Sequence, residues 1–192
     1  MTATTTGLPT AEVTRPRTVL VATMFASVAS FMVFAGVVLV YIRARATSDT
    51  WFDSSAIELG PAGFIFSTLI LSIFTIQWAV QAINNEDRIN AYVALAITAL
   101  FGAAVFNQLW FIINDTGFTL NGSTAEFLYF LVNGTFVVFM LLATAFVALT
   151  FLRAMIGQFG PRKADSVAAA AFFWNTVVAM WAIAWYVIYV TK

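Results

Sequence analysis

The sequence predicts an all-α integral membrane protein, a single bundle of five transmembrane helices over residues 18–192. Two observations predict this fold class. The chain of 192 residues is 61% hydrophobic and only 9% charged, whereas a soluble domain carries about 25% charged residues because its surface faces water. The Asp, Glu, Lys and Arg residues also divide the chain into five long segments that contain none of them.

Each of these charge-free segments is long enough to cross a bilayer. About 20 helical residues span a hydrocarbon core that is about 30 Å thick, since each residue advances the helix by about 1.5 Å. We therefore expect membrane spans at Thr18–Ile42, Leu59–Asn85, Ile89–Asn114, Phe127–Leu152 and Ser166–Thr191.

The Lys and Arg residues predict the orientation of the bundle. Short cytoplasmic loops carry an excess of these residues. Six fall on one side of the predicted spans and three on the other, so the N-terminus is predicted to be cytoplasmic and the C-terminus outside. The first side holds Arg15, Arg17, Arg88, Arg153, Arg162 and Lys163, and the second holds Arg43, Arg45 and Lys192.

Residues 1–17 are predicted to be a mobile cytoplasmic tail. They are rich in Thr, contain Pro and precede the first apolar segment. That segment is too long for the core of a signal peptide and lacks a small-residue cleavage site, so it is interpreted as the first span and not as a cleavable signal.

Composition excludes several functions. The chain contains no His and no Cys, which removes disulfides, iron–sulfur ligation and the usual ligands of zinc, copper and haem. We therefore expect no metal, no cofactor and no catalytic residue in this chain. Equal numbers of acidic and basic residues provide no basic field for nucleic acid. No ionisable side chain except tyrosine lies within a predicted span, which argues against a proton pump or an ion-coupled transporter acting alone.

Neutral polar and small residues within the spans have two interpretations each. Gln77, Asn107, Gln108, Asn133 and Asn175 are predicted to hydrogen-bond between helices, each bond being worth about 0.6 kcal/mol in a membrane; the alternative is that they line a substrate path. Small residues recur at helical spacing at Ala22, Ala26 and Ala29. They are predicted to pack inside the bundle, with a face for another subunit as the alternative.

Four segments, in order along the chain, resemble subunit III of the haem–copper respiratory oxidases. They are Ala29–Gly36 with Tyr41 and Arg45 after it, Leu69–Ala82, Asn133–Val137, and Phe173–Trp181. The match covers nearly the whole chain, and five spans is the number found in short bacterial members. The chain is therefore identified as a divergent member of that family.

The resemblance implies a non-catalytic subunit that packs against the catalytic subunit I, and possibly subunit II, in a hetero-oligomeric complex of the bacterial plasma membrane. Haem and copper are then expected in the partner subunits and none in this chain. Residues expected to serve helix packing are Ser30, Gly36, Asn133, Gly134, Trp174, Asn175 and Trp181.

The resemblance also implies bound phospholipid. Arginine forks match phosphate geometry, and four arginines lie at the ends of predicted spans. Arg43, Arg45, Arg88 and Arg153 are therefore expected to hold lipid headgroups, with ordinary interfacial anchoring as the alternative.

The chain departs from the family at each ionisable position that aligns within a span. Ser30 and Phe111 stand where the family has Glu, and Val178 stands where it has Asp. Asn133, Phe136 and Asn175 stand where it has His. The resemblance therefore does not extend to the roles of those groups, such as supporting proton uptake. Two other functions stay open: a subunit III-like component of nitric oxide reductase or another respiratory complex, and a free-standing small transporter.

Overall fold

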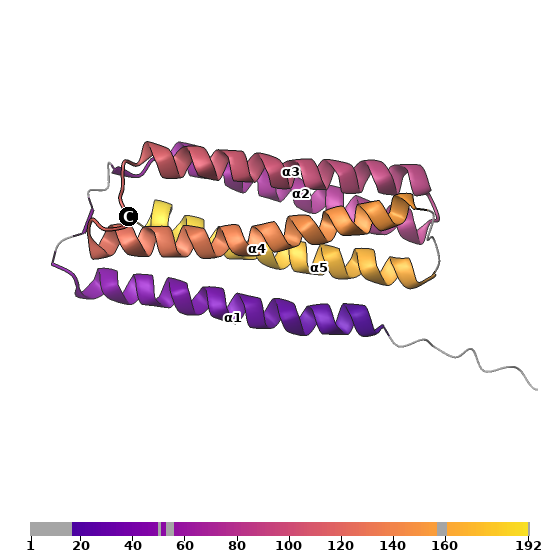
Figure 1. Ribbon diagram of the computed structural model, residues 1–192, viewed down its shortest axis with the longest axis horizontal. Coiled ribbons are helices and arrows are strands. Elements are labelled where there is room, and N and C mark those ends of the chain that lie inside the picture. The colour runs from indigo at the N-terminus through magenta and orange to yellow at the C-terminus, as the bar shows by residue number, and fades with distance from the viewer. Residues whose placement is uncertain (1–16, 50, 53–55, 157–160, 192) are drawn as a thin grey trace, which may run out of the picture.

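The protein folds as a bundle of long helices that run alternately up and down (Figure 1). The computed structural model describes residues 17–49, 51–52, 56–156 and 161–191, with backbone alone for residues 161–163. Within these ranges it contains α1 (Thr18–Thr47), α2 (Leu59–Asn84), α3 (Arg88–Asp115), α4 (Thr124–Met155) and α5 (Pro161–Ala184), which continues as the π-helix η2 (Trp185–Val190). The predicted tail lies outside the described residues, apart from Arg17.

The five predicted spans are confirmed, and several helices extend beyond them. Five helices of the described chain are long and apolar enough to cross a membrane. α1 continues past Ile42 to Thr47, and α4 begins at Thr124, ahead of Phe127. A charge ends an apolar segment but does not end a helix, because Arg, Lys and Glu are good helix formers and their long side chains reach toward water.

Local capping sets two of the helix starts. Asp87 precedes α3, and its carboxylate accepts a hydrogen bond from the Asn90 backbone N–H at 3.2 Å. Ser123 precedes α4, where its hydroxyl accepts from the Glu126 N–H and lies 3.2 Å from the Glu126 carboxylate. These contacts satisfy backbone N–H groups that the first turn of a helix leaves without partners.

α5 is the central helix of the bundle. Of the most apolar part of its span, 61% of the residues are buried, against 22% to 33% in the other four helices. α1, at the opposite extreme, buries only Ser27, Phe34, Val38 and Tyr41 and lies at the edge of the bundle (Figure 1). α1 and α5 run in the same direction, and the two ends of the described chain lie at opposite ends of the bundle.

The distribution of side chains is that of a membrane protein. Large apolar side chains face outward along the helices, such as Phe25, which is 74% exposed, and Leu100, which is 68% exposed. The buried polar residues of the described chain are all neutral: Ser27, Ser72, Thr98, Asn133 and Thr150. Each donates a hydrogen bond to a carbonyl of the preceding turn of its own helix. Polar groups without water must be satisfied within the protein, and these bonds satisfy the side-chain donors, whereas the Asn133 side-chain oxygen has no partner in the described structure.

Gly102 marks a close approach of helices in the described core. A Cβ built on this α3 residue would lie 2.5 Å from Thr144 Oγ1 of α4 and 3.2 Å from the Trp174 ring of α5. The absence of a side chain thus allows three helices to meet. By contrast, nothing lies within 4 Å of a Cβ built at Gly36 or Gly134.

We predict that Gly102→Ala lowers the free energy of unfolding by about 1–3 kcal/mol, because overpacking forces neighbouring side chains and helices to shift. Gly36→Ala and Gly134→Ala are matched controls, which we expect to leave stability unchanged or raise it, since Ala is the better helix former. Unfolding in mixed micelles of dodecyl maltoside and dodecyl sulfate measures the difference. Equal stability of all three variants would contradict the close contact at Gly102.

Candidate functional site

Two tryptophans seven residues apart, Trp174 and Trp181, lie on the inner face of α5. Trp174 and Trp181 are both buried, so this face of α5 packs against protein. The Trp174 indole N–H donates to Ser72 Oγ of α2 at 2.8 Å, and the Ser72 hydroxyl donates to the Leu69 carbonyl at 2.6 Å. A buried hydrogen bond therefore joins α5 to α2.

A second pair of hydroxyls continues this contact from α2 to α3. Thr75 lies one turn beyond Ser72, and its Oγ1 is 2.8 Å from Oγ1 of Thr98. Thr98 is fully buried and donates to the Ala94 carbonyl at 2.8 Å. Together Ser72, Thr75, Thr98 and Trp174 form a neutral hydrogen-bonded group that links three helices; we call it the hydroxyl–indole cluster.

Trp181 takes part in a separate aromatic contact between α4 and the C-terminal helix. Its ring lies 4.8 Å from that of Phe136 and 6.1 Å from that of Tyr189, measured between centroids. The Tyr129 and Tyr189 hydroxyls are 3.2 Å apart and buried. Asn133 donates to the Tyr129 carbonyl at 2.9 Å and lies beside the Tyr189 hydroxyl. Asn133 is thus a core residue at a helix interface.

Aromatic side chains from the connections cover this end of the bundle. Trp51 lies edge-on to Tyr41 at 5.4 Å, and Phe52 lies 5.3 Å from Phe118 in the connection between α3 and α4. Phe118 in turn contacts Tyr129 at 5.3 Å. This cluster could not be predicted from the sequence, because its members come from segments far apart in the chain.

The other residues expected to serve helix packing are less buried. Ser30 and Asn175 are partly buried, whereas Gly36 and Gly134 are exposed and mark no close contact within the described chain. The small residues Ala22, Ala26 and Ala29 are also exposed. The prediction that they pack inside the bundle is wrong, because the buried stripe of α1 passes through Ser27, Phe34, Val38 and Tyr41. The alternative interpretation, that these alanines form a face for another subunit, therefore stays open.

Two arginines join α1 to α5 at opposite ends. Arg45 donates to the Thr191 carbonyl at 2.5 Å, to Thr191 Oγ1 at 3.3 Å and to the Val187 carbonyl at 3.5 Å, and so caps the end of η2. At the other end, the Arg17 guanidinium lies 3.5 Å from the Asp165 carboxylate. Arg45 was expected to hold a lipid headgroup, and its capping contact with η2 was not predicted. Arg43, Arg88 and Arg153 are exposed at helix ends.

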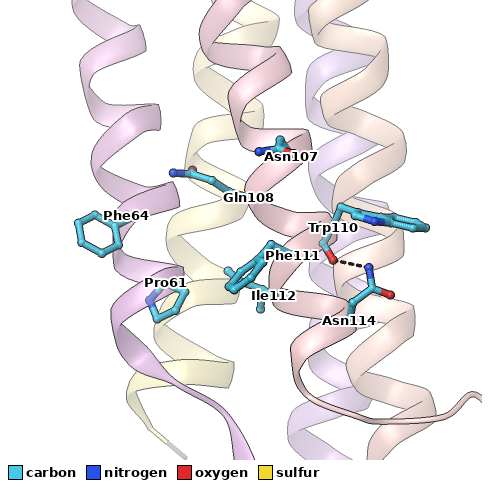
Figure 2. A pocket seen from close by; sticks show the side chains of 8 residues that line it. All are labelled: Pro61, Phe64, Asn107, Gln108, Trp110, Phe111, Ile112 and Asn114. Atoms are coloured by element: carbon cyan, nitrogen blue, oxygen red, sulfur yellow. Dashed lines mark hydrogen bonds between the residues drawn. The ribbon is translucent and has the colours of Figure 1, made fainter.

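A groove opens between the first turns of α2 and the last turns of α3 (Figure 2). Its volume is about 590 Å³, and it is lined by Pro61, Phe64, Asn107, Gln108, Trp110, Phe111, Ile112 and Asn114. Gln108 and Phe111 point toward α2 (Figure 2). The Gln108 side-chain oxygen is buried and has no hydrogen-bond partner in the described structure. The Gln108 oxygen therefore does not form the predicted hydrogen bond between helices. The alternative interpretation, that Gln108 lines a substrate path, stays open.

The described residues offer apolar contact and neutral hydrogen bonding. No group of three or more His, Cys, Asp or Glu side chains that would suit a metal lies within the described ranges. The buried polar residues there are Ser, Thr and Asn, none of which exchanges a proton near neutral pH. The arrangement suits packing and binding.

The chain is similar to curated proteins named cytochrome c oxidase subunit 3. It is 27% identical to that of Pisaster ochraceus over 124 residues, which are 64% of this chain and 47% of the relative. It is 26% identical to that of Patiria pectinifera over 115 residues, 60% of this chain and 44% of the relative. For Loxodonta africana the identity is 26% over 123 residues, 64% of this chain and 47% of the relative.

These similarities confirm the resemblance to oxidase subunit III that the residues carry. The matches span about half the length of the curated relatives. No protein-family model matches the chain.

The hydroxyl–indole cluster makes a quantitative prediction. Trp174→Phe and Ser72→Ala each remove one partner of the buried bond, so a double-mutant cycle should give a coupling of about 0.6 kcal/mol, and at most about 1.7 kcal/mol, in the free energy of unfolding. Trp181→Phe is the matched control, because the Trp181 indole N–H has no hydrogen-bond partner among the described residues. Its cycle with Ser72→Ala should give no coupling. Equal couplings in the two cycles would rule out a specific bond between Trp174 and Ser72.

Proposed function

We propose that this chain is a non-catalytic integral membrane subunit of an aerobic respiratory haem–copper oxidase, where it packs against the catalytic subunit I and stabilises it. The similarity to proteins named cytochrome c oxidase subunit 3 carries this proposal. The five apolar helices support a multi-pass membrane protein, which we place in a bacterial plasma membrane. Subunit II is a further partner in the same complex.

The chemistry of the chain supports a role without catalysis. Redox centres are held by His, Cys and a few other ligands, and the sequence has neither His nor Cys. In this proposal haem and copper belong to the partner subunits. Contacts inside the bundle hold its helices together: the Trp174–Ser72 hydrogen bond joins α5 to α2, and the aromatic contact of Trp181 with Phe136 joins α5 to α4.

We place the partner contact on the outward face of α1. Helices associate in membranes through small residues that let backbones approach closely. Ala22, Ala26, Ala29 and Gly36 are exposed on α1, and Gly36 has open space around it. A second helix can therefore approach there without displacing a side chain.

The exposed arginines at the helix ends are proposed phospholipid contacts. Arg43, Arg88 and Arg153 are exposed at the ends of α1, α3 and α4. Their guanidinium groups match phosphate geometry. In the complex, they would hold headgroups at the two membrane surfaces.

Purification of the tagged chain in mild detergent tests the subunit assignment. We expect haem- and copper-containing chains to co-elute with it, and Ala26→Leu to lower the haem recovered per tagged chain at least threefold, because it fills the small-residue face of α1. Ala104→Leu, at an exposed position of α3, is the matched control and should leave recovery unchanged. Phosphorus analysis should show less bound phospholipid in Arg43→Gln.

Three results would contradict the proposal. They are stoichiometric haem or copper on the isolated chain, co-elution with nitric oxide reductase, and elution of the chain without a partner.

The orientation is tested by reporter fusions. The excess of Lys and Arg on one side places the N-terminus in the cytoplasm. A phosphatase fused after Asp49, in the connection between α1 and α2, should be active because it lies outside. The same enzyme fused after Glu86, between α2 and α3, should be inactive. The reverse result would invert the assignment.

A further inference from the structure

We infer that the groove between α2 and α3 is a binding site for a neutral membrane lipid whose head is a ring that bears a hydroxyl or carbonyl oxygen. The groove is distinct from the α5 face and from the outward face of α1. Its volume of about 590 Å³ lies within the range of sites for small ligands, about 300–1,000 Å³. Annular acyl chains require no polar lining, so the side-chain amides in this groove call for another occupant.

The groove runs from the membrane surface into the hydrocarbon. Pro61 lies in the first turn of α2 and Asn114 in the last turn of α3. Asn107 lies about two turns deeper on α3, or about 11 Å further from the surface. An elongated molecule that enters between the helices can therefore keep its head near Gln108 while its tail stays in lipid.

The lining carries no charge. None of the eight residues around the groove is ionisable, so an ionised phosphate or ammonium group would find no counter-charge there. A charged group away from water is costly unless it is paired. The lining therefore selects against a phospholipid headgroup and in favour of a neutral head.

Side-chain amides supply the polar recognition. Each amide offers both a donor and an acceptor, and the groove has three: Asn107, Gln108 and Asn114. Asn114 donates to the Trp110 carbonyl at 2.8 Å and is held in place by it (Figure 2). The Gln108 oxygen is buried and without a partner. Rotation of the Gln108 amide presents its N–H₂ to a ligand carbonyl or its oxygen to a ligand hydroxyl. Binding of the ligand then removes the cost of an unsatisfied polar atom.

The apolar part of the lining is aromatic. Phe64 of α2 and Phe111 of α3 line the groove and are 69% and 61% exposed. Trp110, which is 72% exposed, also belongs to the lining and extends from the side of α3 away from α2 (Figure 2). Aromatic faces stack on flat or polycyclic rings, which gains more than contact with a flexible chain because less conformational freedom is lost. Two classes of membrane lipid share this chemistry: isoprenoid hydroquinones and polycyclic lipid alcohols.

Native mass spectrometry of the full chain in phosphatidylcholine nanodiscs tests the site. The probes are decylubiquinol, the polycyclic alcohol diplopterol, and dioleoylglycerol, a neutral alcohol without a ring. We expect one ring-headed molecule per chain, with the better retained of the first two probes identifying the class. Gln108→Leu should lower its occupancy at least fivefold. Gln77→Leu, at an exposed position of α2, is the matched control and should retain it.

Phe64→Ala is a second variant, which should also lower occupancy and which alters an exposed side chain that the fold does not need. Equal retention of dioleoylglycerol, equal occupancy in wild type and Gln108→Leu, or no retained ring-headed lipid would each overturn the inference. None of these results depends on whether the chain belongs to an oxidase.

Discussion

The fold depends on one constraint: hydrocarbon offers no hydrogen bonds, so a polar group inside the bundle costs free energy unless it finds a partner in the protein. A polar atom left without one costs several kcal/mol in such a medium. The buried hydroxyls of Ser27, Thr98 and Thr150 meet the constraint locally, by donating to carbonyls of the preceding turn. Ser72 meets it and also accepts from Trp174. These buried hydroxyls are therefore hydrogen-bonded, whereas other buried polar atoms of the described chain, among them Gln108 Oε1 and Trp181 Nε1, have no partner and carry that cost.

The same constraint decides where charges hold the bundle together. α1 packs against α5 and α4 but buries few of its own side chains. Arg17 pairs with Asp165 at one end and Arg45 caps η2 at the other, where charged groups reach water or headgroups. Two such contacts between the same helices require α1 and α5 to be parallel, because an antiparallel pair would bring Arg17 to the wrong end of α5. An odd number of spans from α1 to α5 provides that arrangement.

Spans were predictable from the sequence because a charge-free segment of this length has few alternatives in water. The tryptophan face of α5 was predictable too, since Trp174 and Trp181 are seven residues apart. Contacts that depend on three helices at once were not predictable from the sequence. Gly102 is indistinguishable in sequence from Gly36, yet Gly102 faces Thr144 and Trp174 while Gly36 faces open space. The Ala22, Ala26 and Ala29 stripe has the spacing of a packed face, but spacing does not say which neighbour it packs against. The groove was missed because its lining comes from two helices.

The structure shows what surrounds three neutral residues that align, by resemblance, with ionisable residues of the subunit III family. Phe136 packs on Trp181, Val178 is buried, and Phe111 lines the groove beside Gln108. A buried carboxylate or imidazolium at such places would need a partner or a proton path, and it would cost free energy without one. Apolar side chains convert the same positions into packing surface. In the proposed complex the chain acts through the surfaces it presents, the outward face of α1 and the groove between α2 and α3, because the side chains at these positions are neutral and offer packing and not charge.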